Sequence, residues 1–396
     1  MTTLQHRNIR INRTLSRLGI FDFTRVAIYL ERGMTLPQTL LIGVSYNIGC
    51  LVFNSLSHKL KNTCRDKLQL STILKLIFFI TLVTNKTFIG FCLGSALMGI
   101  SDTLSTVNTD TYVYAVYKDD HPNIMQKVIA DSTIIALFFN VFVSLTFQIA
   151  FWLPVVILCF VQLVVFFTGN KLPNIEVTSK LEEPKEKQST RNIIEQIRKD
   201  VNTKQISLLV GVMITVKVVM ILMIKTKPYY LKALPFSTKT LGLIDTAAQL
   251  GQVVSRKVPK KYKTLEFVHV TLIALMFVTI ISPFVKPLYY IPYMLITPFC
   301  MSSLMPVISK TIGDYTENSK QMSRILNYCD LVNNIVVIAF LFIISKVFVN
   351  NPFYYGYFVA FPIMLLGLGF ITAFLNMSNN FENSTTIIAV KPSKVI

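Results

Sequence analysis

Residues 152–167 read WLPVVILCFVQLVVFF, an apolar block without a single charged side chain. A polar segment rich in Glu and Lys follows it, from Lys171 to Lys204. The block is close to the roughly 17–25 residues that a helix needs to cross a bilayer. The segment after it is too polar to lie in lipid. This boundary therefore predicts a membrane-spanning helix followed by a loop in water.

The rest of the chain repeats this kind of block. Of the 396 residues, 52% are hydrophobic and 15% are charged, against roughly 25% charged residues in a soluble domain. The strong spans are expected at Thr39–Ser57, Leu68–Val83, Phe88–Tyr114, Val128–Ile149, Trp152–Phe167, Ile206–Ile224, Leu265–Ile281, Leu288–Ile312, Ile325–Val349 and Phe353–Leu375. Two weaker spans are expected at Leu15–Gly33 and Leu241–Val254. The composition indicates an all-α membrane protein.

The basic residues set the topology. If all twelve segments span and the N-terminus is cytoplasmic, the inner loops hold 28 Lys and Arg residues and the outer loops hold 7. Such an imbalance is what the positive-inside rule predicts. We therefore expect both termini in the cytoplasm. The net charge of +19 lies in short loops, so it indicates topology and not nucleic-acid binding.

The long polar segment divides the chain. We expect a six-helix bundle over residues 1–170, a cytoplasmic linker over 171–204 and a second six-helix bundle over 205–396. Inverted or parallel repeats of this kind are common among transporters.

Two local motifs support this layout. Residues 29–38 read YLERGMTLPQ, similar to the "aromatic-x-x-[KR]-G-[LM]-[ST]-x-x-Q" end of a first helix. Residues 99–114 read GISDTLSTVNTDTYVY, similar to a "G-x-x-D…E-A-W-L-Y-D" fourth helix. With these motifs the chain resembles the major facilitator superfamily. It departs from that family in the loop 57–67, which lacks the expected glycines, and in Val128–Ile149, which lacks the "G-x-x-x-G-P" antiporter motif.

The resemblance implies two halves that rock around a central cavity, lined by the first, fourth, seventh and tenth spans. Ionisable residues inside such spans are the best candidates for function, because a charge in lipid is costly. In Leu15–Gly33, Asp22 and Arg25 lie three residues apart and so share a helix face. They form either a self-sufficient ion pair or part of the cavity.

The fourth span has the densest polar run, over residues 101–111. Asp102 is expected near the middle of the membrane, and Asp110 about two turns nearer the cytoplasm. Desolvation favours the neutral form of such a carboxyl group, which suits a proton carrier. The alternative is a polar network that only packs helices.

The seventh span contains Lys217 among apolar residues. A carboxylate partner is expected, and Asp22 and Asp102 are the candidates. Lys75 is expected to extend its ammonium group toward the inner edge of the membrane. Asp330, in the eleventh span, is expected to serve helix packing.

These features predict a secondary active transporter of the cytoplasmic membrane of a bacterium. It would move a small molecule by alternating access, coupled to protons, in the direction of export. The alternatives are a proton-coupled importer of a small polar solute, and a membrane sensor or immunity-type protein that has lost transport. No nucleophile–base pair, Walker motif or Cys/His cluster is visible, so we expect neither an enzyme nor a cofactor or metal site.

Overall fold

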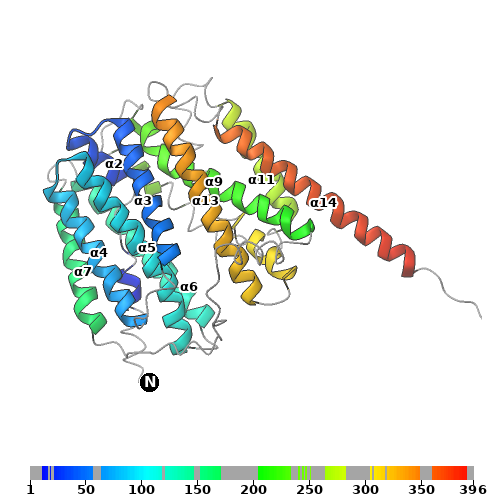
Figure 1. Ribbon diagram of the computed structural model, residues 1–396, viewed down its shortest axis with the longest axis horizontal. Coiled ribbons are helices and arrows are strands. Elements are labelled where there is room, and N and C mark those ends of the chain that lie inside the picture. The colour runs from blue at the N-terminus through cyan, green and yellow to red at the C-terminus, as the bar shows by residue number, and fades with distance from the viewer. Residues whose placement is uncertain are drawn as a thin grey trace, which may run out of the picture.

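The computed structural model describes residues 11–16, 18, 22–56, 64–117, 121–146, 152–170, 204–232, 264–281, 307–316, 319–347 and 359–389, with scattered positions between 240 and 305. Within these residues all regular secondary structure is helical (Figure 1). The labelled helices are α2 (Asp22–Glu31), α3 (Leu36–Leu56), α4 (Cys64–Thr84), α5 (Phe88–Tyr117), α6 (His121–Thr146), α7 (Leu153–Asn170), α9 (Lys204–Lys232), α11 (Leu265–Ile281), α13 (Ser319–Val347) and α14 (Phe361–Ala389). The all-α prediction is confirmed.

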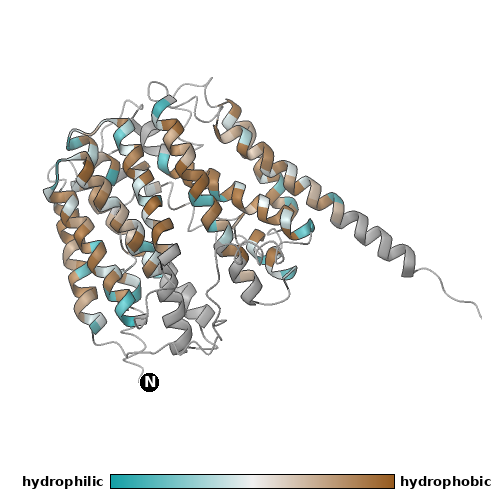
Figure 2. Cartoon of the chain, in the orientation of Figure 1, coloured by the Kyte–Doolittle hydropathy of each residue, from teal (hydrophilic) through white to brown (hydrophobic). Residues whose placement is uncertain are grey.

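Six helices in the described part of the chain are long and apolar enough to cross a membrane. These segments are Leu36–Phe53, Arg65–Thr84, Phe88–Ser105, Leu153–Asn170, Lys204–Leu222 and Tyr328–Lys346. Figure 2 shows hydrophobic colour along most of their length. Three shorter apolar helices lie at Ile134–Val143, Leu265–Ile281 and Phe361–Met377. The total of twelve spans and the cytoplasmic termini stay predictions. Most of Leu241–Val254 and of Leu288–Ile312 falls outside the described residues.

The sequence motif at residues 29–38 builds the turn between α2 and α3. Gly33 has a positive φ of 84°, and the N–H groups of Gly33 and Met34 donate to the carbonyls of Leu30 and Tyr29, both at 3.0 Å. This pattern is a Schellman motif, which ends a helix with a left-handed glycine. Thr35 and Gln38 then exchange side-chain to backbone hydrogen bonds across the first turn of α3, as in a capping box. The motif therefore fixes how the first two helices meet.

Close helix crossings hold the N-terminal helices together. A Cβ placed on Gly99 of α5 would lie 2.1 Å from the carbonyl oxygen of Tyr46 on α3. A Cβ on Gly49 would lie 2.1 Å from the carbonyl oxygen of Ala96. Both distances are far inside van der Waals contact, so only glycine permits this approach. Small residues at crossings are typical of membrane helices.

The described helices before residue 171 contact those after residue 203. α3 packs against α13, α2 packs against α9, and α3 also touches α9. Leu40 and Val44 of α3 belong to the same buried apolar cluster as Leu341 of α13 and Val216 of α9. The contact between the two groups of helices is therefore largely apolar at these positions.

The outward faces of the helices are apolar as well. Ile89 and Leu93 on α5 and Phe160 on α7 are each at least 64% exposed. Large apolar side chains that face outward from a helix bundle are what contact with lipid requires.

Candidate functional site

Asp102 lies where α4 packs against α5. The Asp102 Oδ1 atom is 3.5 Å from the ammonium nitrogen of Lys75 on α4. One position before Asp102, Ser101 donates to the backbone carbonyl of Ser71 at 2.7 Å, and Ser71 donates back to the carbonyl of Ser101 at 3.0 Å. Since Ser71 and Lys75 are four residues apart, they share one face of α4. The serine contact thus sets the register that brings Lys75 to Asp102.

Lys75 corrects a prediction from the sequence. Its side chain was expected to reach the membrane edge, but it is only 5% exposed and its ammonium group also donates to the backbone carbonyl of Ser16 at 3.0 Å. The reason is tertiary: α5 offers a carboxylate at the same depth, and a buried charge is stabilised by such a partner. The Asp102 side chain is 34% exposed, so the pair is buried on the lysine side and open on the aspartate side.

Tyr46 connects Asp102 to a cavity. Its hydroxyl group donates to Asp102 Oδ2 at 3.0 Å. The close crossing at Gly99 brings the Tyr46 backbone near α5 and so allows this reach. The ring of Tyr46 lines a cavity of about 30 Å³, which has room for about two water molecules. One side chain therefore touches both the carboxylate and the cavity.

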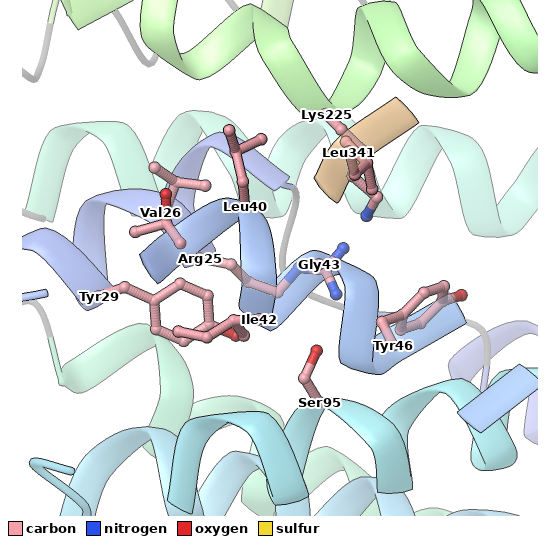
Figure 3. Close-up of a pocket in the computed structure, with 11 residues that line it drawn as sticks. Arg25, Val26, Tyr29, Leu40, Ile42, Gly43, Tyr46, Ser95, Lys225 and Leu341 are labelled. Atoms are coloured by element: carbon pink, nitrogen blue, oxygen red, sulfur yellow. The ribbon is translucent and has the colours of Figure 1, made fainter. Parts of the chain in front are cut away.

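Two cations also line this cavity. The guanidinium carbon of Arg25 on α2 lies 5.9 Å from the centre of the Tyr46 ring, and the ammonium nitrogen of Lys225 on α9 lies 4.9 Å from it. Figure 3 shows both head groups directed toward the same space beside Tyr46. The other described lining residues are Val26, Tyr29, Thr39, Leu40, Ile42, Gly43, Ser95 and Leu341. Helices from both sides of the linker thus contribute to one cavity.

Lys217 has the kind of partner that was expected but not the expected residue. Its ammonium nitrogen lies 2.5 Å from Asp330 Oδ1 on α13. The prediction of Asp22 or Asp102 as partner is wrong, because Asp102 is paired with Lys75 and α13 packs directly against α9. Lys217 is not among the residues that line the cavity. Asp330, which was assigned to helix packing, supplies the countercharge.

The structure does not describe the side chains of the remaining two candidates, Asp22 and Asp110. Asp22 begins α2 and Asp110 lies on α5. Of the five candidates from the sequence, Arg25 and Asp102 are brought together through Tyr46.

Sequence reasoning missed Tyr46 and Lys225. Lys225 was one of the seven basic residues counted outside the membrane. It lies on α9, which continues to Lys232, past the apolar segment Lys204–Leu222. The polar run Ser45-Tyr46-Asn47 inside an otherwise apolar span was the available signal for Tyr46.

The fold of this chain is similar to that of solved structures. One similar solved structure is the nucleoside transporter NupG, with 12% sequence identity and a TM-score of 0.69, covering 94% of this chain and 98% of that chain. A point mutant of NupG gives 13% identity and a TM-score of 0.71, covering 94% and 99%. No protein-family model and no curated protein sequence matches the chain. At such low identity the similarity is one of fold.

Proposed function

We propose that this chain, which has the fold of the major facilitator superfamily, is a secondary transporter of a small polar molecule in the cytoplasmic membrane of a bacterium. One observation carries the proposal. A paired carboxylate, Asp102, is joined by Tyr46 to a cavity that helices from both sides of the linker line. Such a fold places substrate and coupling-ion sites near the middle of the bilayer, between its two halves.

The cost of these charges supports a functional role. Placing a charged side chain at the centre of a membrane costs about 2.5–3.5 kcal/mol or more. Asp102, Arg25 and Lys225 each contact Tyr46, and Lys75 pairs with Asp102. A helix bundle that served only as a scaffold would be more stable with apolar residues at these positions. The charges are therefore best explained by a polar solute that enters the cavity.

The contacts between the helix groups suit alternating access. We take residues 1–170 and 205–396 as the two moving halves, joined by the cytoplasmic linker 171–204. At their contact, Leu341 of α13 lies near Gly43 of α3, and Leu40 and Val44 share an apolar cluster with α9 and α13. Apolar contacts of this kind lack directional bonds that would hold one geometry, so the halves can separate on either side of the cavity in turn.

Asp102 is proposed as the ionisable residue of the transport cycle. Its carboxylate accepts a hydrogen bond from Tyr46, and the buried Lys75 balances its charge. The Tyr46–Asp102 hydrogen bond lies within the first half, and separation of the two halves gives water access to the carboxylate, to which it can bring a proton. Asp22 on α2 and Asp110 on α5 are proposed as supporting ionisable groups. The direction of export expected from the sequence finds no support in the structural comparisons.

The proposal is tested in liposomes. Purified protein is reconstituted with a pH-sensitive dye inside, and members of a panel of small polar solutes are added with and without a pH gradient. We expect at least one solute to accumulate above the level in protein-free liposomes and to move protons with it. If a solute crosses without any proton signal, the proposal of a transporter stands and the proposal of proton coupling is wrong. If folded protein moved no member of the panel, the transporter proposal would be contradicted.

A further inference from the structure

We propose that Lys225 is a positioning residue of the transport cycle: it holds the two halves together through its contact with the Tyr46 ring while Asp102 is charged. This inference rests on the proposed function, because it names the contact through which the charge of Asp102 reaches the second half. Tyr46 belongs to the first half, and its two ends have partners in different halves.

The Tyr46 side chain contacts both halves of the chain. Its hydroxyl group donates to Asp102 Oδ2 on α5 at 3.0 Å. The ammonium nitrogen of Lys225 on α9 lies 4.9 Å from the centre of its ring (Figure 3). Among the described lining residues of the cavity, Lys225 and Leu341 come from the second half, and Leu341 is apolar. Lys225 therefore brings a charge of the second half to the residue that is hydrogen-bonded to Asp102.

The charge of Asp102 affects how strongly the ring attracts Lys225. A cation within roughly 6 Å of an aromatic face is attracted by the negative charge of that face. Groups joined by a hydrogen bond polarise one another. A charged Asp102 therefore makes the face of Tyr46 more negative, and a neutral Asp102 makes it less so.

Lys75 acts in the same direction. Its ammonium group contacts the backbone carbonyl of Ser16 at 3.0 Å and the carboxylate of Asp102 at 3.5 Å. The carbonyl has no net charge, so a proton on Asp102 removes the countercharge that the described structure gives to Lys75. The charge of Lys75 then repels Lys225 more strongly, because both are cations in a region of low dielectric constant. Both effects weaken the contact between Lys225 and Tyr46 when Asp102 is neutral.

The other ionisable groups near this contact belong to the first half. The guanidinium carbon of Arg25 on α2 lies 5.9 Å from the centre of the Tyr46 ring. Cys50 lies one turn after Tyr46 on α3, and Asp131 is ionisable among the described side chains of α6, which packs against α5. All three are present in both charge states of Asp102. They therefore contribute a background that the change of charge on Asp102 does not alter.

The contact links the charge of Asp102 to the separation of the halves. A conformational equilibrium shifts only through contacts that differ between the two states. The contact between Lys225 and Tyr46 exists when the halves are together, and it is lost when they separate at the cavity. A charged Asp102 therefore favours the closed arrangement, and a neutral Asp102 favours opening.

The test measures opening of the cavity by the labelling of an introduced cysteine. All six native cysteines are replaced by alanine, and Ser95→Cys is added, because Ser95 lines the cavity and is 3% exposed. A water-soluble thiol reagent reaches this position in purified protein when the halves separate, so its rate of reaction reports the fraction of open molecules. Lys86→Cys, in the exposed turn between α4 and α5, is the reference and should react equally in every variant.

Lys225→Met should raise the labelling rate at position 95 by roughly 5- to 30-fold, the factor expected for loss of a cation–π contact in a partly buried place. Lys204→Met is the matched control, because it removes a positive charge from the exposed start of the same helix. Its rate should equal that of the background. Lys225→Arg keeps a cation and should stay near the background rate. Melting curves check folding, and Lys225→Gln replaces Lys225→Met if that protein does not fold.

Double variants then test the link to Asp102. Asp102→Asn should raise the labelling rate by itself and should add little to Lys225→Met, because both changes weaken the same contact. Tyr46→Phe keeps the ring and removes the hydroxyl group. In that variant Asp102→Asn should have a smaller effect, whereas Lys225→Met should still raise the rate.

Three results would overturn the inference. They are a background rate in folded Lys225→Met protein, effects of Lys225→Met and Asp102→Asn that multiply, and an effect of Asp102→Asn that persists in full without the Tyr46 hydroxyl group. Failure of the proposed function gives a different result. Liposome transport by wild-type protein, together with unchanged labelling in Lys225→Met, would refute the role of Lys225 and leave the transporter. The expected labelling without transport of any solute would do the reverse.

Discussion

Among the residues that the structure describes, two lysine–aspartate pairs lie on the membrane helices, and they differ in what surrounds them. Lys75 and Asp102 are 3.5 Å apart, with side-chain exposures of 5% and 34%. Lys217 and Asp330 are 2.5 Å apart, with exposures of 14% and 53%. Asp102 also accepts a hydrogen bond from Tyr46, whose ring lines the cavity, whereas neither Lys217 nor Asp330 is part of that lining.

The comparison shows that an ion pair inside a membrane helix is not by itself a functional signal. Lys217 stood out in the sequence because it is surrounded by apolar residues, yet its contact with Asp330 joins two neighbouring helices, α9 and α13. Lys75 was expected to extend toward the edge of the membrane, yet its partner Asp102 accepts a hydrogen bond from Tyr46, which lines the cavity. We therefore assign the N-terminal pair to the transport cycle and the C-terminal pair to the stability of the second helix group.

The largest effect is expected from Lys75→Met. Removing a buried partner leaves an uncompensated charge, which typically costs about 3–5 kcal/mol. Because Asp102 is a third exposed, we expect about 3 kcal/mol, seen as a lower melting temperature in detergent. The double variant Lys75→Met/Asp102→Asn should recover part of that loss. If the double variant is no more stable than the single one, the two residues are not energetically coupled.

Gly99→Ala should cost about 2 kcal/mol, within the range for overpacking a tight contact. The new methyl group would meet the backbone oxygen of Tyr46 and push α3 away from α5. This change should also lower transport, because Tyr46 would no longer reach Asp102. Gly369→Ala on α14 is the control, since nothing lies within 4 Å of the corresponding position. Melting curves that do not separate the two variants would argue against the close crossing.

Tyr46→Phe removes the hydroxyl group but keeps the ring in the cavity. A hydrogen bond to a charged group is worth about 1.5–3 kcal/mol, and we expect the lower end because Asp102 keeps its lysine. Transport should fall about tenfold, while binding of solute in the cavity changes little. A fall in binding that matches the fall in transport would show that the hydroxyl group serves the cavity and not Asp102.

Lys217→Met should have the smallest effect, about 1 kcal/mol of stability, because its partner Asp330 lies near the start of the apolar segment Tyr328–Lys346 and is more than half exposed. The rate of transport per folded molecule should stay close to that of wild type. Loss of stability equal to that of Lys75→Met would remove the contrast between the two pairs.

The sequence predicted the fold class because long apolar blocks and the bias of basic loops depend only on local composition. The turn motif at residues 29–38 was also recognisable, since Gly33 and Thr35 act through neighbouring residues. The partners of Lys75 and Lys217 could not be predicted in this way. They depend on which helix faces which, and the serine contact between Ser71 and Ser101 that sets the register of α4 and α5 has no signature along the chain.

Lys225 illustrates a second limit. Lys225 follows the apolar part of its span, so the sequence places it outside the membrane. In the structure α9 continues past it to Lys232, and its side chain lines the cavity. Tyr46 was one aromatic residue among many in apolar spans. Its importance comes from a contact at each end of its side chain, one with Asp102 and one with the cavity.

The most direct test compares Asp102→Asn with Asp330→Asn in the liposome experiment, using the solute that wild-type protein moves. Both substitutions keep the shape of the side chain and remove its charge, and melting curves in detergent check that both proteins are folded. We predict that Asp102→Asn lowers gradient-driven uptake by about a hundredfold, as expected for loss of a proton-transfer group, while Asp330→Asn keeps most of it. Wild-type uptake by folded Asp102→Asn protein, or an equal loss in both variants, would contradict the assignment of Asp102 to the transport cycle.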